Sequence, residues 1–212
     1  MKSRQIVDGF RKFKPLVTRV VCTAWKDAIA CHANTGRIRP GELGSLLHVT
    51  MRTGFRVAAD ELDPYIVLVE EPDGRGLDYL KVDIGAKTPL AVRFSKQNKN
   101  RDRISRNQTC RTADILDQGM LFDDDDEELP VVTIVVRVSD HYYESGKLCA
   151  FLSRIVLVHE YDGGFDFLDR IARFSKSDPN ARAEDVGVPR IGIKDERREI
   201  QEEITALRKK LA

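Results

Sequence analysis

The stretch that most constrains the fold runs from Val131 to Tyr161, and its pattern predicts a long β-hairpin. The first half, Val131 to Val138, is dense in β-branched residues, which fit a pleated and half-buried surface. The second half runs from Phe151 to Tyr161. Between them, Glu144-Ser-Gly-Lys147 supplies a glycine that can take the positive φ of a tight turn. Any fold of this chain therefore has to accommodate two long antiparallel strands.

Folding the chain at that turn predicts a register for the hairpin. The predicted pairs are Val138 with Ser153, Val136 with Ile155, Ile134 with Leu157 and Val132 with His159. Because side chains alternate between faces, these residues form one apolar face. The other face is mixed and carries Thr133, Arg137, His141 and Tyr143 together with Val135, Val156 and Val158. A slip of one residue would turn the apolar face outward, so burial should fix the register.

The segments before and after the hairpin show both helical and strand periods. Apolar spacing predicts one helix carrying Ile6, Phe10 and Phe13, and a second from Pro15 to about Ala33. A short helix over 42–51 is predicted in a region that several glycines weaken. Alternation predicts strands over 65–70, 77–84 and 90–94. For 165–174 we expect the start of a strand followed by a helix.

These elements predict an α+β fold with N-terminal helices, an antiparallel sheet built from two hairpin or meander units, and a C-terminal amphipathic helix. The expected organisation is a single domain over 1–174, a linker over 175–193 and the helix over 194–212. Within the domain, 95–129 is expected to be a mobile polar loop, because long structureless connections are uncommon in compact domains.

The C-terminal helix has a heptad-like seam formed by Ile193, Ile200, Ile204, Leu207 and Leu211. A helix this short is not stable alone, so its seam has to pack on a second copy of the chain or on the N-terminal helices. Of the two, we favour the second copy. The expectation is therefore a homo-oligomer held by Ile200, Ile204, Leu207 and Leu211.

The net charge of +1 hides a strong segregation along the chain. Residues 1–56 carry a net charge of +8 and residues 93–111 carry +6, whereas residues 57–92 carry −5 and residues 112–128 carry −8. Such blocks decide the choice of partner more than the mean charge does. We expect a cationic surface for nucleic acid formed by Arg11, Lys12, Lys14, Lys96, Lys99, Arg101, Arg103, Arg106 and Arg111. The alternative is a solvated loop neutralised by the acidic run Asp123 to Glu128, which could also cover the cationic surface.

The pentapeptide Gln118-Gly-Met-Leu-Phe122 resembles the Gln-x-x-Leu-Phe peptide by which bacterial replication and repair proteins dock on the sliding clamp. The resemblance implies that the Gln118 amide anchors one end while Leu121 and Phe122 enter an apolar groove. The competing interpretation is a hydrophobic plug that packs within the chain.

The motifs of common enzyme classes are missing from the sequence. It has no serine nucleophile elbow, no phosphate-binding loop and no dinucleotide fingerprint, and its histidines lack metal-ligand spacing. Asp83 to Lys87, with Asp78 and Glu70 or Glu71, suggests a divalent-metal nuclease, but the usual acidic-x-Lys spacing is absent. We therefore expect no catalytic residue, no metal and no cofactor.

Four scattered cysteines fit a reducing compartment, and no apolar run approaches the length of a membrane span. We expect a cytoplasmic protein that does not contact a membrane. The leading hypothesis is a non-enzymatic accessory or regulatory protein that self-associates and binds nucleic acid through a basic surface. The alternatives are a protein-interaction module, such as an inhibitor or antitoxin-like partner, and a divalent-metal-dependent nuclease.

Overall fold

The structure is a computed structural model that describes residues 3–35, 40–69, 79–87, 89–98, 130–144, 147–161, 164–175, 177–178, 181 and 193–211. The helical elements are α1 (Ser3–Phe10), the 3-10 turn η1 (Arg11–Phe13), α2 (Lys14–Thr35), α3 (Pro40–Leu62) and α5 (Ile193–Leu211). The strands are β1 (Ile66–Val69), β2 (Tyr79–Val82), β3 (Leu90–Asn98), β4 (Val131–Glu144), β5 (Lys147–Tyr161) and β6 (Gly164–Arg173).

The described strands form one six-stranded sheet in the order β1-β2-β3-β4-β5-β6. All neighbours are antiparallel except β3 and β4, which run parallel from the pair Ala91–Val131 to the pair Asn98–Val138. The two predicted hairpin units therefore meet in a single sheet, and the predicted α+β class is confirmed. Ser95 to Asn98, which we expected at the start of the polar loop, belong to β3.

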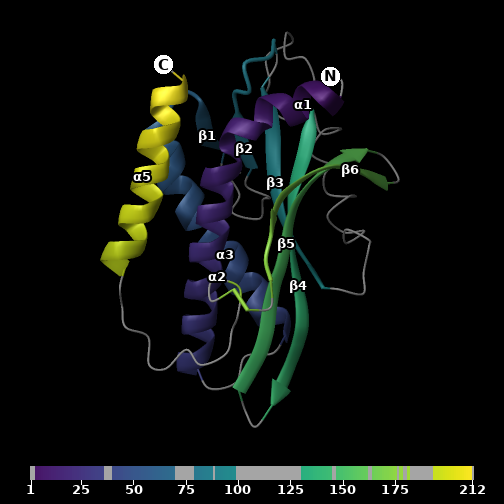
Figure 1. Cartoon of the computed structure of the whole chain (residues 1–212), viewed down its shortest axis with the longest axis vertical. Helices are drawn as coiled ribbons and strands as arrows, with labels where there is room; N and C mark the ends of the chain where they lie inside the picture. The colour runs from purple at the N-terminus through teal and green to yellow at the C-terminus, as the bar shows by residue number, and fades with distance from the viewer. Residues whose placement is uncertain are drawn as a thin grey trace.

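The helices lie on one side of the sheet, where α2 packs against β5 and β6, α3 packs against β1 and β3, and α5 packs on α2 and α3 (Figure 1). The low amphipathicity of α2 has a simple cause, since α3, α5, β5 and β6 all pack against it. Its sequence carries apolar residues around most of its circumference, including the fully buried Trp25 and Ala28. On α3, the Phe55 ring stacks on Phe94 of β3 with ring centroids 4.5 Å apart. Together these contacts make one continuous core.

The hairpin register is confirmed for three of the four predicted pairs, Val132 with His159, Ile134 with Leu157 and Val136 with Ile155. The fourth was wrong by one residue, because Val138 pairs with Leu152. Ser153 is the extra residue of a β-bulge, and its hydroxyl donates to the Arg137 carbonyl oxygen at 3.0 Å. The bulge reverses the alternation, so that Leu152 enters the core in place of a serine.

The prediction of a helix at the end of 165–174 was wrong, because β6 is a strand over its whole length. Two register shifts in the β5–β6 pairing leave Leu168 and Ile171 without a partner residue on β5. Each bulge inserts one residue, which changes the spacing of side chains on one face from two to three. Leu168, Ile171 and Ala172 consequently pack on the same core. This spacing imitates the period of a helix.

Helix α3 is longer than the predicted 42–51 and continues through Gly54. Its buried stripe of Leu43, Leu47, Met51, Phe55 and Leu62 outweighs the low helix propensity of glycine. Gly54 has a packing role, since an added Cβ would lie 2.8 Å from Cγ1 of Val20 on α2. The missing side chain lets the two helices approach closely.

The seam of α5 packs on the chain's own helices, α2 and α3. Ile200, Ile204 and Leu207 are almost fully buried, and Leu211 is partly buried against the same core. The contact is reinforced at its polar margin, where Arg208 donates to Glu61 and the Tyr65 hydroxyl donates to the Leu211 carbonyl oxygen. The N-terminal helices therefore occupy the surface that we expected a second copy to use, and self-association itself stays a prediction.

Part of the predicted linker also contacts the core. The Ala181 carbonyl oxygen accepts from the indole nitrogen of Trp25 at 3.2 Å and from the amide of Leu152 at 2.8 Å. Ala181 is fully buried, so this one carbonyl ties α2 to β5.

The α5 packing predicts that Ile204→Ala lowers the free energy of unfolding by about 2–5 kcal/mol, because it leaves a cavity beneath the helix. Thr205→Ala is the matched control, since Thr205 is the next residue and faces solvent. Denaturant melts should separate the two variants while light scattering gives the wild-type mass for both. A changed mass for Ile204→Ala with unchanged stability would contradict intramolecular packing of the seam.

Candidate nucleic-acid interface

The face of the sheet turned away from the helices contains an ordered array that we call the outer grid. It follows from the registers of β3, β4, β5 and β6, because residues paired across strands point to the same face. Its ten positions form three rows: Arg93, Thr133, Val158 and Phe167; Val135, Val156 and Arg170; and Arg137, Arg154 and Arg173. The alternate residues of β4 and β5 enter the core beneath the helices.

The outer grid is strongly basic. Five of its positions are arginine and none is aspartate or glutamate. Three of these, Arg137, Arg154 and Arg173, are directly paired on consecutive strands and form what we call the arginine row. Adjacent strands lie about 4.8 Å apart, so the row concentrates positive charge over a short distance. Like charges directly opposite each other are unfavourable for folding.

The middle of the outer grid is closed to solvent, and its margin is open. Val135, Val156 and Val158 form a second buried cluster with exposed fractions of 1–2%, and Arg93 is also buried. In contrast, Arg154, Arg170 and Arg173 are exposed, and Phe167 is 60% exposed. The accessible part of the grid is therefore β6 together with the end of β5 at Arg154.

Because of its bulges, β6 carries its acidic side chains on one face of the sheet and its arginines on the other. Asp166 and Asp169 pair with His159 and Leu157 and thus lie on the helix side, while Arg170 and Arg173 lie on the outer side. On the helix side, the Lys14 ammonium lies 2.5 Å from the Asp169 carboxylate and also donates to the Arg170 carbonyl oxygen at 3.1 Å. The acidic residues of β6 are thereby kept apart from the arginines of the outer grid.

The predicted N-terminal cations Arg11, Lys12 and Lys14 each contact another side chain of the same chain. The Arg11 guanidinium donates to the Asp8 carboxylate at 3.1 Å, and the Lys12 ammonium lies 5.3 Å from the centre of the Phe13 ring. Lys14 is turned inward to Asp169 and is 23% exposed. Lys96 lies in β3. The remaining predicted cations, Lys99, Arg101, Arg103, Arg106 and Arg111, lie outside the described residues.

Of the residues predicted to contact a protein partner, one group packs in the core and the other lies outside the described residues. Ile200, Ile204, Leu207 and Leu211 form the α5 seam described above, whereas Gln118, Leu121 and Phe122 lie outside the described residues. Sequence reasoning missed Arg154, Phe167, Arg170 and Arg173. Strand alternation along β5 would have placed Arg154 on the same face as Val156. Phe167, Arg170 and Arg173 could not be assigned to a face of the sheet, because the bulges of β6 are not visible in the sequence.

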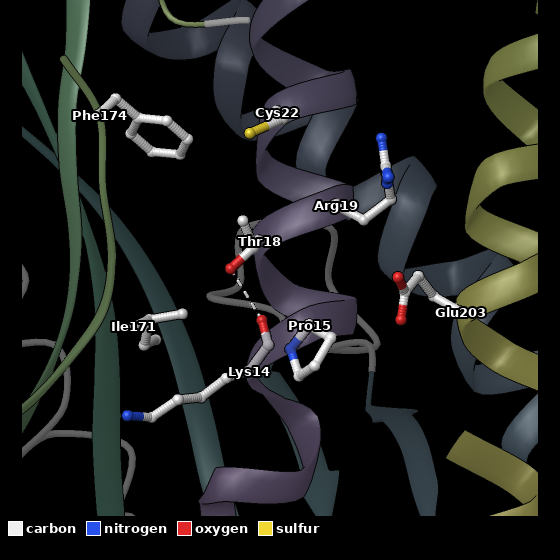
Figure 2. Close-up of a pocket in the computed structure, with 8 residues that line it drawn as sticks. All are labelled: Lys14, Pro15, Thr18, Arg19, Cys22, Ile171, Phe174 and Glu203. Atoms are coloured by element: carbon white, nitrogen blue, oxygen red, sulfur yellow. Dashed lines mark hydrogen bonds between the residues drawn. The ribbon is translucent and has the colours of Figure 1, made fainter. Parts of the chain in front are cut away.

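A cavity of about 420 Å³ opens between α2, β6 and α5 (Figure 2). Its polar wall is occupied by internal contacts, since the Thr18 hydroxyl donates to the Lys14 carbonyl oxygen at 2.8 Å and the Lys14 ammonium is bound to Asp169. On its apolar side, Figure 2 shows the Cys22 thiol pointing toward Phe174. Burial, and secondarily the charge of Asp178, raises the pKa of the Cys22 thiol to about 11. The thiol is therefore protonated at neutral pH and is a poor nucleophile.

The proposed nuclease carboxylates have a different role where the structure describes them. The Asp83 carboxylate accepts from the backbone amide of Gly85 at 2.7 Å, and Gly85 has a φ of +78°. Asp83 thus stabilises a turn. Asp78, Glu70 and Glu71 lie outside the described residues. Among the residues that are described, no three His, Cys, Asp or Glu side chains gather closely enough to hold a metal ion.

Comparison with known proteins identifies no relative: no family model, curated protein or solved structure matches this chain. Within its described part, none of the helices is both long and apolar enough to cross a bilayer.

The arginine row predicts that Arg173→Gln raises the free energy of unfolding by about 0.2–1 kcal/mol at low salt, because it removes a like-charge pair with Arg154. The gain should shrink as added salt screens the repulsion. Arg208→Gln is the matched control, and it should lower the stability slightly because it removes the contact with Glu61. Thermal melts at two salt concentrations measure both effects. Destabilisation by Arg173→Gln of more than about 1 kcal/mol would show that the row is not repulsive.

Because the Cys22 thiol is buried and protonated, we expect it to be alkylated slowly. At pH 8, iodoacetamide should modify the exposed Cys31 much faster than Cys22, because Cys22 is buried and its pKa is raised. Mass-spectrometric peptide mapping over a time course measures the two rates. Equal rates would contradict the protonated, enclosed thiol.

Proposed function

We propose that the protein is a non-enzymatic accessory or regulatory protein that binds nucleic acid, and that the margin of the outer grid makes the contact. The observation that carries this proposal is the concentration of arginine in the outer grid, where five positions are arginine. Arginine is suited to phosphate because its planar fork donates two hydrogen bonds at once.

Counterion release supports a polyanionic partner. The guanidinium groups of Arg170 and Arg173 are exposed on β6. A nucleic acid whose phosphates contact them releases its own condensed counterions, and this release favours binding.

An acidic protein is the alternative partner, in keeping with the protein-interaction hypothesis. It would use the same charges, but its affinity would not follow the counterion release of a nucleic-acid lattice. Salt dependence therefore distinguishes the two partners.

The test replaces Arg154, Arg170 and Arg173 together by Gln and measures binding to labelled oligonucleotides across a salt series. The wild type should show a linear fall of log affinity with log salt, and the triple variant should lose a slope of about 2–3, which corresponds to three phosphate contacts. The control replaces Arg198, Lys209 and Lys210 on α5 by Gln, which changes the charge equally on the helix side of the molecule.

The control should bind as tightly as the wild type apart from a small loss of long-range attraction. Equal losses in the two triple variants would assign the binding to net charge and would exclude the outer grid. Absence of binding by the wild type at low salt would refute the proposed function.

A further inference from the structure

Phe167 is an unusual side chain for a basic sheet face. It is 60% exposed, and the other large hydrophobic side chains described as exposed, Val49, Val57 and Val67, are all aliphatic. It ends the first row of the outer grid, next to the buried Val158. Exposing a phenyl ring to water is unfavourable, because its apolar area contributes to stability only when it is buried.

The position of Phe167 relative to the arginines comes from the bulges of β6. With one extra residue in each step, Phe167, Arg170 and Arg173 all point to the outer side at intervals of three residues. Because each bulge sets three residues of β6 opposite two of β5, and two strand residues span about 6.6 Å, consecutive side chains of this set lie roughly 7 Å apart. A flat apolar ring is thus followed along the same strand by two exposed guanidinium groups.

We infer that the outer grid takes nucleic acid as a single strand, with a base stacked on the Phe167 ring and the backbone running past Arg170 and Arg173. This rests on the proposed function and adds the class of nucleic acid to it. Bases of any identity can stack on an aromatic ring, while arginines follow the phosphates, so the site would be tolerant of sequence.

The geometry disfavours a duplex at this surface. In a duplex the base faces are stacked on one another and are not available to Phe167. A duplex would instead meet the accessible part of the grid with its phosphates, which Arg154, Arg170 and Arg173 can contact without Phe167.

The experiment compares a 20-nucleotide oligothymidylate with a 20-base-pair duplex by fluorescence anisotropy at one salt concentration. The wild type should bind the single strand more tightly. Phe167→Ala should weaken single-strand binding by about 5- to 150-fold, which is the range for the loss of one stacked base. Its effect on duplex binding should stay below about twofold, since charge alone would hold the duplex.

Two further substitutions separate stacking from simple apolar contact. Phe167→Trp keeps a ring and should retain the affinity for the single strand, whereas Phe167→Leu keeps apolar bulk and should lose it. Val49→Ala is the control, because Val49 is exposed to the same degree on α3. Thermal melts of all variants confirm that folding is retained, as expected for solvent-facing positions.

The outcomes distinguish this inference from the proposed function. Equal binding of the two nucleic acids, or full affinity in Phe167→Leu, would overturn single-strand stacking while the arginine variants still tested the interface. Loss of single-strand binding in Phe167→Ala with recovery in Phe167→Trp would establish it. A wild type that binds neither nucleic acid would overturn both.

Discussion

The period of two along β4 and β5 is the constraint on which the rest of the structure depends. One set of side chains, including Ile134 and Leu157, closes the core against the helices, and the alternate set, including Arg137 and Arg154, forms the outer grid. Neither face can be changed independently, because a shift of one residue exchanges them. The Ser153 bulge shows how tightly this holds, since it resets the alternation where the sequence would otherwise bury a serine.

Much of the fold could be predicted from the sequence, because the apolar periodicity of most segments matches the residues that the fold buries. The hairpin register was correct up to Val136, and the α+β class followed from the order of the elements. The errors in the hairpin register and in β6 share one cause, which is that β-bulges alter the period on which such predictions depend, whereas α3 was predicted too short because its glycines were given too much weight. In β6 the spacing of Leu168 and Ile171 imitated a helix, and this error concealed Arg170 and Arg173. The outer grid could not be assembled without pairings that only the three-dimensional structure provides.

Charge blocks along the sequence predicted the position of the basic surface less well than the charges that strand pairing brings to one face of the sheet. Arg11 and Lys14 belong to the basic N-terminal block, yet each lies within 3.1 Å of an aspartate oxygen. The arginines of the outer grid come from three strands in a region of nearly balanced charge, together with Arg93. Strand pairing therefore creates a basic surface that no local window of the sequence displays, whereas the tertiary contact with Asp169 turns Lys14 away from the basic N-terminal block.

The irregular spacing of β6 has a further consequence for the behaviour of the protein at high concentration. β6 is the last strand in the sheet order, and a terminal strand offers its backbone to strands of other molecules. Bulges and outward charges are the usual means of making such a strand a poor template, and β6 has both. The same two inserted residues that aim Arg170 and Arg173 outward thus protect the chain against fibrous aggregation through its sheet. Any assembly of this protein should accordingly form through surfaces other than strand addition at β6.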